Sequence, residues 1–241
     1  MMHQLKLSNF ARSPDLFEEV IRRAPAVPEA HAWLAVKYVM SIFNGWSSSQ
    51  LKETDIALDC PARALDLEPE TSFAPTIDGV VNNNLLLRMD AAQDRFDAAF
   101  DRNPNESMAW LLSGVLCAYR DNGADAVART EKAMRLSPLD PFGHFFDSLA
   151  STAYVAAERW DRALEVADRS IAKNDRHLST LRVRICALPY LGRTDGTRKA
   201  AADLLRRQPG FSIFTYRRSH PAAHFKVGGH MTAAFTSAGI P

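Results

Sequence analysis

A six-residue phrase recurs along the chain at a nearly constant spacing, and this repetition constrains the fold more than any other feature. The phrase begins with an apolar residue and ends, five residues later, with a proline. Its ends are Pro25, Pro69, Pro104, Pro138 and Pro209, and a sixth copy, which begins with Ser170, ends at Asp175. The intervals between successive ends are 44, 35, 34, 37 and 34 residues. A period in this range indicates a repeat architecture, in which each unit packs on its neighbours.

In four copies, small side chains and an occasional larger one stand at fixed offsets before the last residue of the phrase. They include Ala92, Phe96 and Ala99 before Pro104, Ala126, Thr130 and Ala133 before Pro138, Ala163, Ala167 and Ser170 before Asp175, and Ser13, Phe17 and Val20 before Pro25. Small side chains let a neighbouring helix approach closely, and a larger one fills the remaining gap. A proline then follows where the helix has ended, because it cannot continue one. The pattern therefore predicts a helix that closes every unit.

The sequence predicts an all-α chain of antiparallel helix pairs that form a right-handed superhelical solenoid. The expected helices cover 14–24, 29–43, 53–67, 72–87, 90–102, 107–120, 124–136, 141–156, 160–173, 178–190 and 195–207. Pro61 should kink its helix or delay its start. We expect residues 1–241 to form a single domain, with repeats over about 10–209. Residues 210–241, with a short helix near 221–237, should cap the last unit, whose apolar face needs a cover.

Composition excludes several classes of protein. Hydrophobic residues make up 46% of the chain and charged residues 24%, as in ordinary globular proteins. The net charge of +1 does not indicate nucleic-acid binding or a basic membrane-binding patch. The three cysteines, Cys60, Cys117 and Cys186, are too scattered for a metal or redox motif and indicate reduced thiols. The N-terminus does not resemble a secretory signal. We therefore expect a cytoplasmic protein without cofactors.

The chain resembles the tetratricopeptide repeat (TPR) family over nearly its whole length. Trp110, Gly114 and Cys117 fit the tryptophan, glycine and tyrosine slots of one first helix. Leu34 and Tyr38 fit slots of another, and Gly79 fits the glycine slot of a third. Residues 34–47, 133–142 and 238–241 look like repeat regions that follow bacterial class III adenylate cyclase domains or winged-helix DNA-binding domains. That resemblance implies a regulatory module of a signalling protein.

The TPR resemblance also implies where a partner binds, because the first helices of successive units line a concave groove in that family. The groove-facing slots carried onto this sequence are Phe73, Thr76, Val80, Asn83, Asn84, Met108, Leu111, Val115, Tyr119, Phe142, Phe145 and Phe146. The slots that capture a chaperone tail in some members hold Ala32, Val36, Leu112, Phe142 and Phe146, and this departure argues against capture of a tail carboxylate. The three phenylalanines are either partner anchors or core, because groove and core slots differ by one residue.

Other combinations of residues favour simple structural roles. His220 and His224 have the spacing of a zinc-ligand pair, and His230 follows, but they lack an acidic or thiol neighbour and are expected to be exposed. Val227-Gly228-Gly229-His230 lacks a phosphate-loop lysine and is expected to form a turn. The pairs Asp55/Asp59 and Asp97/Asp101 are expected to face water rather than a catalytic cleft.

These observations favour a non-catalytic scaffold that binds a protein or peptide in its concave groove, and the subgroup resemblance implies a cyclase-like signalling system as its setting. The alternative is an enzyme or small-ligand-binding protein with a site in the groove or in the C-terminal cap.

Overall fold

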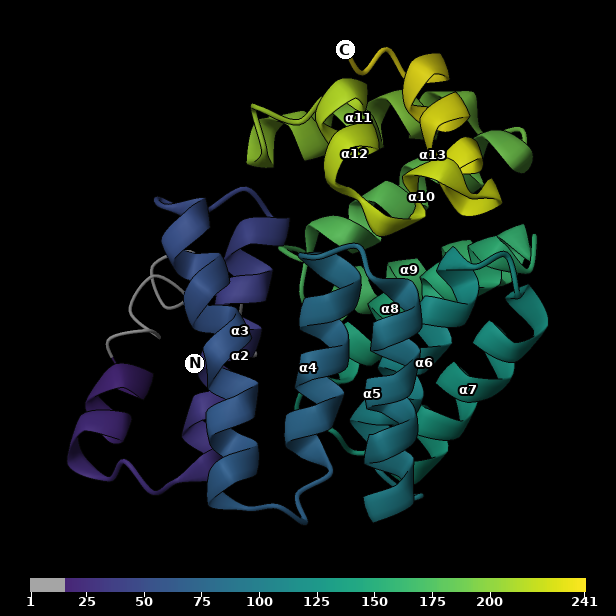
Figure 1. The fold of residues 1–241 in the computed structure, drawn as a ribbon. Coiled ribbons are helices and arrows are strands. Elements are labelled where there is room, and N and C mark those ends of the chain that lie inside the picture. Colours follow the sequence, from purple (N-terminus) through teal and green to yellow (C-terminus); the bar gives the residue numbers. More distant parts are fainter. Residues whose placement is uncertain (1–15) are drawn as a thin grey trace. The chain divides into compact units, whose positions relative to one another are not determined.

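The computed structural model describes residues 16–241, and these residues form helices joined by short connections (Figure 1). A helical stretch over 16–23 comes first. The helices that follow are α2 (Pro28–Phe43), α3 (Gln50–Leu67), α4 (Phe73–Asn84), α5 (Met89–Arg102), α6 (Ser107–Tyr119), α7 (Gly123–Leu136), α8 (Gly143–Ala156), α9 (Trp160–Lys173), α10 (Leu178–Tyr190), α11 (Thr194–Arg207), α12 (Ile213–Ser219), the 3-10 turn η2 (Pro221–His224) and α13 (Lys226–Ser237). The all-α prediction is confirmed for these residues.

The small residues that precede each repeated phrase pack where the sequence predicts. The side chains before Pro104, Pro138 and Asp175 are all buried on the second helices α5, α7 and α9. Gly114 of α6 shows why they are small: a Cβ atom there would lie 2.8 Å from Thr130 Cγ2 and 3.1 Å from the Ala126 carbonyl oxygen. At Gly79 of α4, an added Cβ would lie 2.7 Å from the Phe96 ring. Ser13 lies outside the described residues.

The structure corrects two local expectations. The helix that contains Pro61 begins at Gln50 and runs to Leu67, so the proline does not delay its start, and the kink stays a prediction. Gly228 and Gly229 lie inside α13 and not in a turn. Gly228 is needed there because an added Cβ would lie 2.1 Å from the Ala222 carbonyl oxygen, so only glycine lets η2 approach α13 this closely.

Contacts group the chain into two compact units, residues 1–109 and 110–241, and the boundary falls within α6. We call them unit 1 and unit 2. The single continuous domain expected from the sequence therefore stays a prediction. In unit 1, α2 packs on α3 and α4, and α4 packs on α5. Its core joins Leu34, Tyr38, Ala57, Ile77 and Val81.

Unit 2 continues the pairing, because α7 packs on α8, α8 on α9, and α9 and α11 on α10. The C-terminal segment then departs from it. Helix α13 packs on α10 and also touches α8, which are the first helices of two successive pairs (Figure 1). Residues 211–240, which include α12, η2 and α13, lie in the segment for which the sequence predicts a cap, and we call them the cap. Phe211, Tyr216 and Phe235 form its aromatic core, with ring centroids 5.3 Å apart for both Phe211–Phe235 and Tyr216–Phe235.

Candidate interaction surface

The predicted partner-binding residues divide into buried and half-buried groups. The buried ones are Thr76, Asn83, Leu111, Val115, Tyr119 and Phe146. The half-buried ones are Phe73, Val80, Asn84, Met108, Phe142 and Phe145. Half-buried side chains have exposed surface that a partner can contact, whereas the buried side chains are covered by other residues of the chain. The partner-binding role of the set stays a prediction.

In unit 1 several half-buried apolar side chains pack against the core, and three of them lie on the first helices α2 and α4. Val36, Phe73 and Val80 pack against the core without entering it fully. Phe73 also contacts Trp33 of α2, with ring centroids 5.1 Å apart. Phe73, Val80 and Asn84 are seven and four residues apart, which places them on one face of α4.

The helix expected over 141–156 begins later than predicted, and this changes the positions of Phe142, Phe145 and Phe146. Helix α8 begins at Gly143, so Phe142 precedes it and does not share a helical face with Phe145 and Phe146. The three residues inserted into this repeat lie in the connection 137–142, which Asp140 closes through its hydrogen bonds to Phe142 N (2.8 Å) and Ser137 Oγ (2.8 Å). The shift places Phe146 in the core, at 2% exposure.

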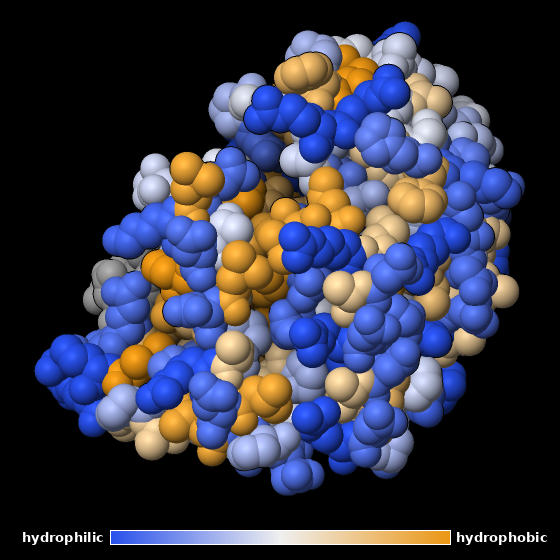
Figure 2. Space-filling view, in the orientation of Figure 1, coloured by the Kyte–Doolittle hydropathy of each residue, from blue (hydrophilic) through white to orange (hydrophobic). Residues whose placement is uncertain are grey.

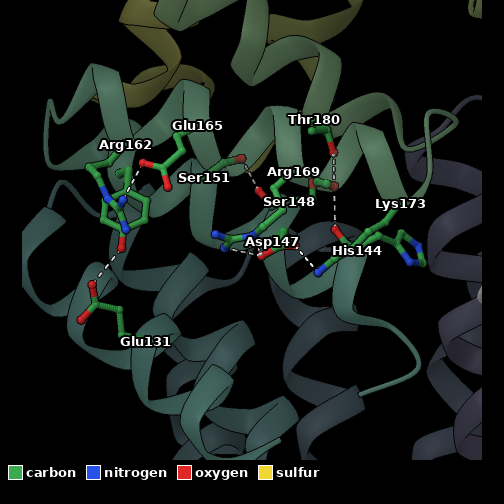
Figure 3. Close-up of polar contacts among 12 residues, drawn as sticks. Glu131, His144, Asp147, Ser148, Ser151, Arg162, Glu165, Arg169, Lys173 and Thr180 are labelled. Carbon is green, nitrogen blue, oxygen red and sulfur yellow. Dashed lines mark hydrogen bonds and ion pairs between the residues drawn. The ribbon is translucent and has the colours of Figure 1, made fainter. Parts of the chain in front are cut away.

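A buried ion cluster was missed by sequence reasoning and joins α8 to α9 (Figure 3). The Asp147 carboxylate is buried in α8 and accepts hydrogen bonds from Arg169 Nη2 (2.6 Å) and Lys173 Nζ (2.7 Å). Both cations come from α9, where their spacing of four residues puts them on one face. The sequence signal was the spacing of Arg169 and Lys173 together with an aspartate within the preceding expected helix.

Beside this ion cluster, a serine and a histidine form a buried pair. His177 Nδ1 lies 2.7 Å from Ser148 Oγ and 3.2 Å from Thr180 Oγ1. Burial, with a contribution from His144 and Arg182, lowers the pKa of His177 to about 3. A histidine that resists protonation is a poor general base at neutral pH, and Ser148 is fully buried. The pair therefore lacks the access and basicity that a nucleophile and its base need.

One face of α10 is covered by residues that follow α11. Arg182, Cys186 and Tyr190 are four residues apart and share one face. Arg182 Nη2 donates to Gln208 Oε1 (3.1 Å), and its guanidinium lies 5.1 Å from the Phe211 ring centroid. Tyr190 Oη is hydrogen-bonded to His230 Nδ1 at 2.7 Å. This face of α10 is therefore covered by a C-terminal segment of the same chain.

Two cap histidines pack at this contact, contrary to the expectation that they are exposed. His230 is half-buried, edge-on to Trp160 at 5.1 Å and with Nε2 3.5 Å from Glu158 Oε1. His220 stacks on Tyr216 at 4.5 Å and meets the Tyr119 ring of α6 edge-on at 5.2 Å. Burial, and secondarily the nearby Arg182, hold the pKa of His220 well below its usual value. Only His224 of the three is exposed.

The charge of the chain is divided unevenly between the two units. Unit 1 holds 10 lysine and arginine residues and 16 aspartate and glutamate residues, whereas unit 2 holds 19 and 12. In unit 1, Asp94, Asp97 and Asp101 form an exposed stripe on α5, over which Figure 2 shows a largely hydrophilic surface. Asp55 and Asp59 on α3 are exposed, as expected. The net charge of +1 thus hides two oppositely charged units.

Two other kinds of site are absent from residues 16–241. These residues contain no helix that is long and apolar enough to cross a bilayer. They also contain no group of three histidine, cysteine, aspartate or glutamate side chains placed to hold a metal ion. The three cysteines are free and buried, and burial raises the pKa of Cys60 to about 11 and that of Cys186 to about 12.

Comparison with solved structures places the helix pairs in the TPR-like fold. TTC0263, a thermophilic TPR protein of Thermus thermophilus, matches with a TM-score of 0.55 at 16% identity, over 77% of this chain and 92% of that one. A chain of the APC/C hetero-tetramer Cut9–Hcn1 matches with a TM-score of 0.67 at 11% identity, over 95% of this chain and 40% of that one. IFIT1 in complex with m7Gppp-AAAA matches with a TM-score of 0.66 at 13% identity, over 96% and 55%.

These matches define the protein as a TPR-like helical repeat protein by fold. This chain spans about half or less of the lengths of the Cut9–Hcn1 and IFIT1 chains. No family model and no curated protein match the sequence. The resemblance to repeat regions of cyclase-type signalling proteins is not supported by these comparisons and stays a prediction from the sequence.

Proposed function

We propose that the protein is a non-catalytic scaffold that binds a protein segment on the inner sides of its first helices. One observation carries this proposal: in unit 2 those helices already hold a helical segment, because α13 packs on α10 and touches α8. A face that accommodates one amphipathic helix has the shape and the mixed apolar and polar character to hold another. The TPR-like fold, which presents such faces in series, agrees with this use.

Unit 1 supplies the face on which we place the external partner. Val36, Phe73 and Val80 offer half-buried apolar surface there, and Asn84 adds a polar edge. Apolar side chains that are fixed by a core but not covered make effective anchors, since little conformational freedom is lost on binding. The acidic character of unit 1 favours a partner segment that carries lysine or arginine.

Catalysis is the weaker alternative, because the Ser148–His177 pair is buried and its histidine resists protonation. Nucleic acid is a second alternative, since the related fold of IFIT1 holds a capped RNA and unit 2 carries more basic than acidic residues. Several of these basic residues are engaged in ion pairs, among them Arg169, Lys173 and Arg207.

We infer a cytoplasmic role for the protein. The resemblance of residues 34–47 favours a cyclase-like signalling system as its setting.

The experiment that tests the proposal is capture with the purified full chain, followed by identification of the bound molecules and affinity measurement with the purified partner. Val80→Glu should reduce the affinity of that partner by about thirtyfold or more, the loss expected when an anchor is removed. The matched control is Leu58→Glu on α3, where the replaced leucine is 37% exposed and lies on a second helix. Equal loss in both variants, or recovery of nucleic acid alone, contradicts the proposal.

A further inference from the structure

The cap is fixed to the helices of unit 2 by contacts that gather at two places. At the first, His230 of α13 meets Tyr190, Trp160 and Glu158, which come from the ends of α10, α9 and the turn after α8. At the second, Phe211 meets Arg182 and His220 meets Tyr119 of α6. The backbone N–H of Lys226 also donates to Asp121 Oδ1 at 2.8 Å. The cap therefore contacts three successive first helices or their ends.

Within itself the cap is closed and well formed. Ser212 and Thr215 make a capping box at the start of α12. After α13, Gly239 has a positive φ of 77°, and Ile240 N donates to Phe235 O at 3.0 Å, which completes a Schellman-type ending. The N–H of Ile213 donates to Pro241 O, so the two ends of the cap meet. These bonds keep the cap together as one element.

A short connection joins the cap to α11. Pro209 and Gly210 are exposed, and a Cβ atom added at Gly210 would find no neighbour within 4 Å. Water reaches the contact between the cap and Tyr190, because that tyrosine is 46% exposed. An element with its own internal bonds, an exposed connection and a contact open at one side can detach without unfolding the helices beneath it.

We propose that residues 211–240 act as an intramolecular occupant of a partner site, and that they block the faces of α8 and α10 that they cover until they are displaced. This inference rests on the proposed function, since it assigns to unit 2 a binding face of the same kind. The occupant that the cap excludes is a short amphipathic helix that presents aromatic rings and an imidazole group. These are the groups that the cap itself places on Arg182, Tyr190 and Tyr119. Binding there is consequently reduced by competition with the cap.

The test uses two adjacent glycines of α13 in the full-length chain. Gly228→Val places a side chain against the Ala222 carbonyl oxygen of η2, at 2.1 Å for Cβ alone, so η2 and α13 must separate and α13 should lose its fixed position on α10. Gly229→Val is the matched control, since a Cβ there has no neighbour within 4 Å. The probe is a fluorescent synthetic peptide of residues 211–240, added to each protein. We expect the Gly228→Val protein to bind it at least about tenfold more tightly than the wild type, and the Gly229→Val protein to behave as the wild type.

Hydrogen exchange followed by mass spectrometry supplies the second measurement. Amides of α13 should exchange faster in Gly228→Val than in the wild type, while those of α8 and α10 stay protected. If Gly228→Val does not fold, His230→Ala replaces it, because that change removes the contacts with Tyr190, Glu158 and Trp160 but no packing between η2 and α13. Equal peptide affinity for released and wild-type chains, or no binding to a chain whose cap is shown to be released, overturns the inference.

The peptide measurement uses no external partner. Failure of the proposed function, in which neither the wild type nor Gly228→Val captures a protein, can therefore be told apart from failure of this inference.

Discussion

Asp147 and Arg169 form the buried end of the ion cluster between α8 and α9, with Asp147 Oδ1 2.6 Å from Arg169 Nη2. Both cations of the cluster reach the surface, whereas the carboxylate does not. Loss of one cation leaves the other in place, but loss of both leaves a buried charge without compensation. We expect Arg169→Ala or Lys173→Ala alone to lower the free energy of unfolding by about 1–2 kcal/mol, and the double variant by about 3–5 kcal/mol. Urea denaturation of the four proteins measures this, and strictly additive losses contradict it.

Acid should destabilise the protein through His177. Its pKa is lowered to about 3 in the folded state, while an unfolded histidine titrates near 6.5. The stability contribution is therefore fully present above pH 6.5 and is lost as the pH falls from there toward 3, at up to about 1.4 kcal/mol per pH unit. His220 contributes with the same sign. A plot of the melting temperature of His177→Gln against pH, between pH 7 and pH 4.5, should be flatter than that of the wild type.

The contact between α6 and α7 should reject a large side chain. Ala126 is fully buried, and its carbonyl lies 3.1 Å from the position of a Cβ at Gly114. Ala126→Phe should cost about 1–3 kcal/mol through overpacking. Ala128→Phe, on the exposed side of the same helix, is the control and should cost less than about 0.5 kcal/mol. Equal denaturation midpoints for the two variants would show that the repeat register is wrong.

Phe145 and Phe146 should behave differently, although they are adjacent. Phe146 is in the core, so Phe146→Ala should lower the free energy of unfolding by about 3–5 kcal/mol. Phe145 is half-buried and contacts His177 edge-on at 5.6 Å, so the loss in Phe145→Ala should be clearly smaller. Guanidinium denaturation compares the two. A larger loss for Phe145 would place it in the core and exclude it as an anchor for a partner.

The second helices could be predicted from the sequence because their packing is local and periodic. Ala92, Phe96 and Ala99 keep fixed offsets from Pro104, and the copies of this pattern on α7 and α9 are buried in the same way. The buried face of α8 could not be predicted in the same way, because three inserted residues separate this helix from Pro138. Repeat positions assigned to α8 by their distance from Pro138 are therefore wrong. Positions assigned by their distance from Ala163 on α9 are right, since α8 and α9 pack as a pair.

The position of the cap could not be predicted, because it depends on contacts between distant parts of the chain. His220 and Tyr119, or His230 and Glu158, carry no pattern that links them in the sequence. The polar residues that the cap contacts also look like surface residues when only their sequence neighbours are considered. Arg182 is an example: a basic residue with apolar neighbours on both sides is indistinguishable in the sequence from one whose charge reaches water.

The connection 137–142 absorbs its extra residues outside the helices, and this has a practical use. Its backbone is held by Asp140, while Leu139 at its tip is 93% exposed. Lengthening such a loop costs little, because the entropy of closure grows slowly with length. A fluorophore or a short epitope attached at Leu139 would therefore report on the molecule from a fixed point, without disturbing the packing of α7 on α8 or the faces on which we place partners.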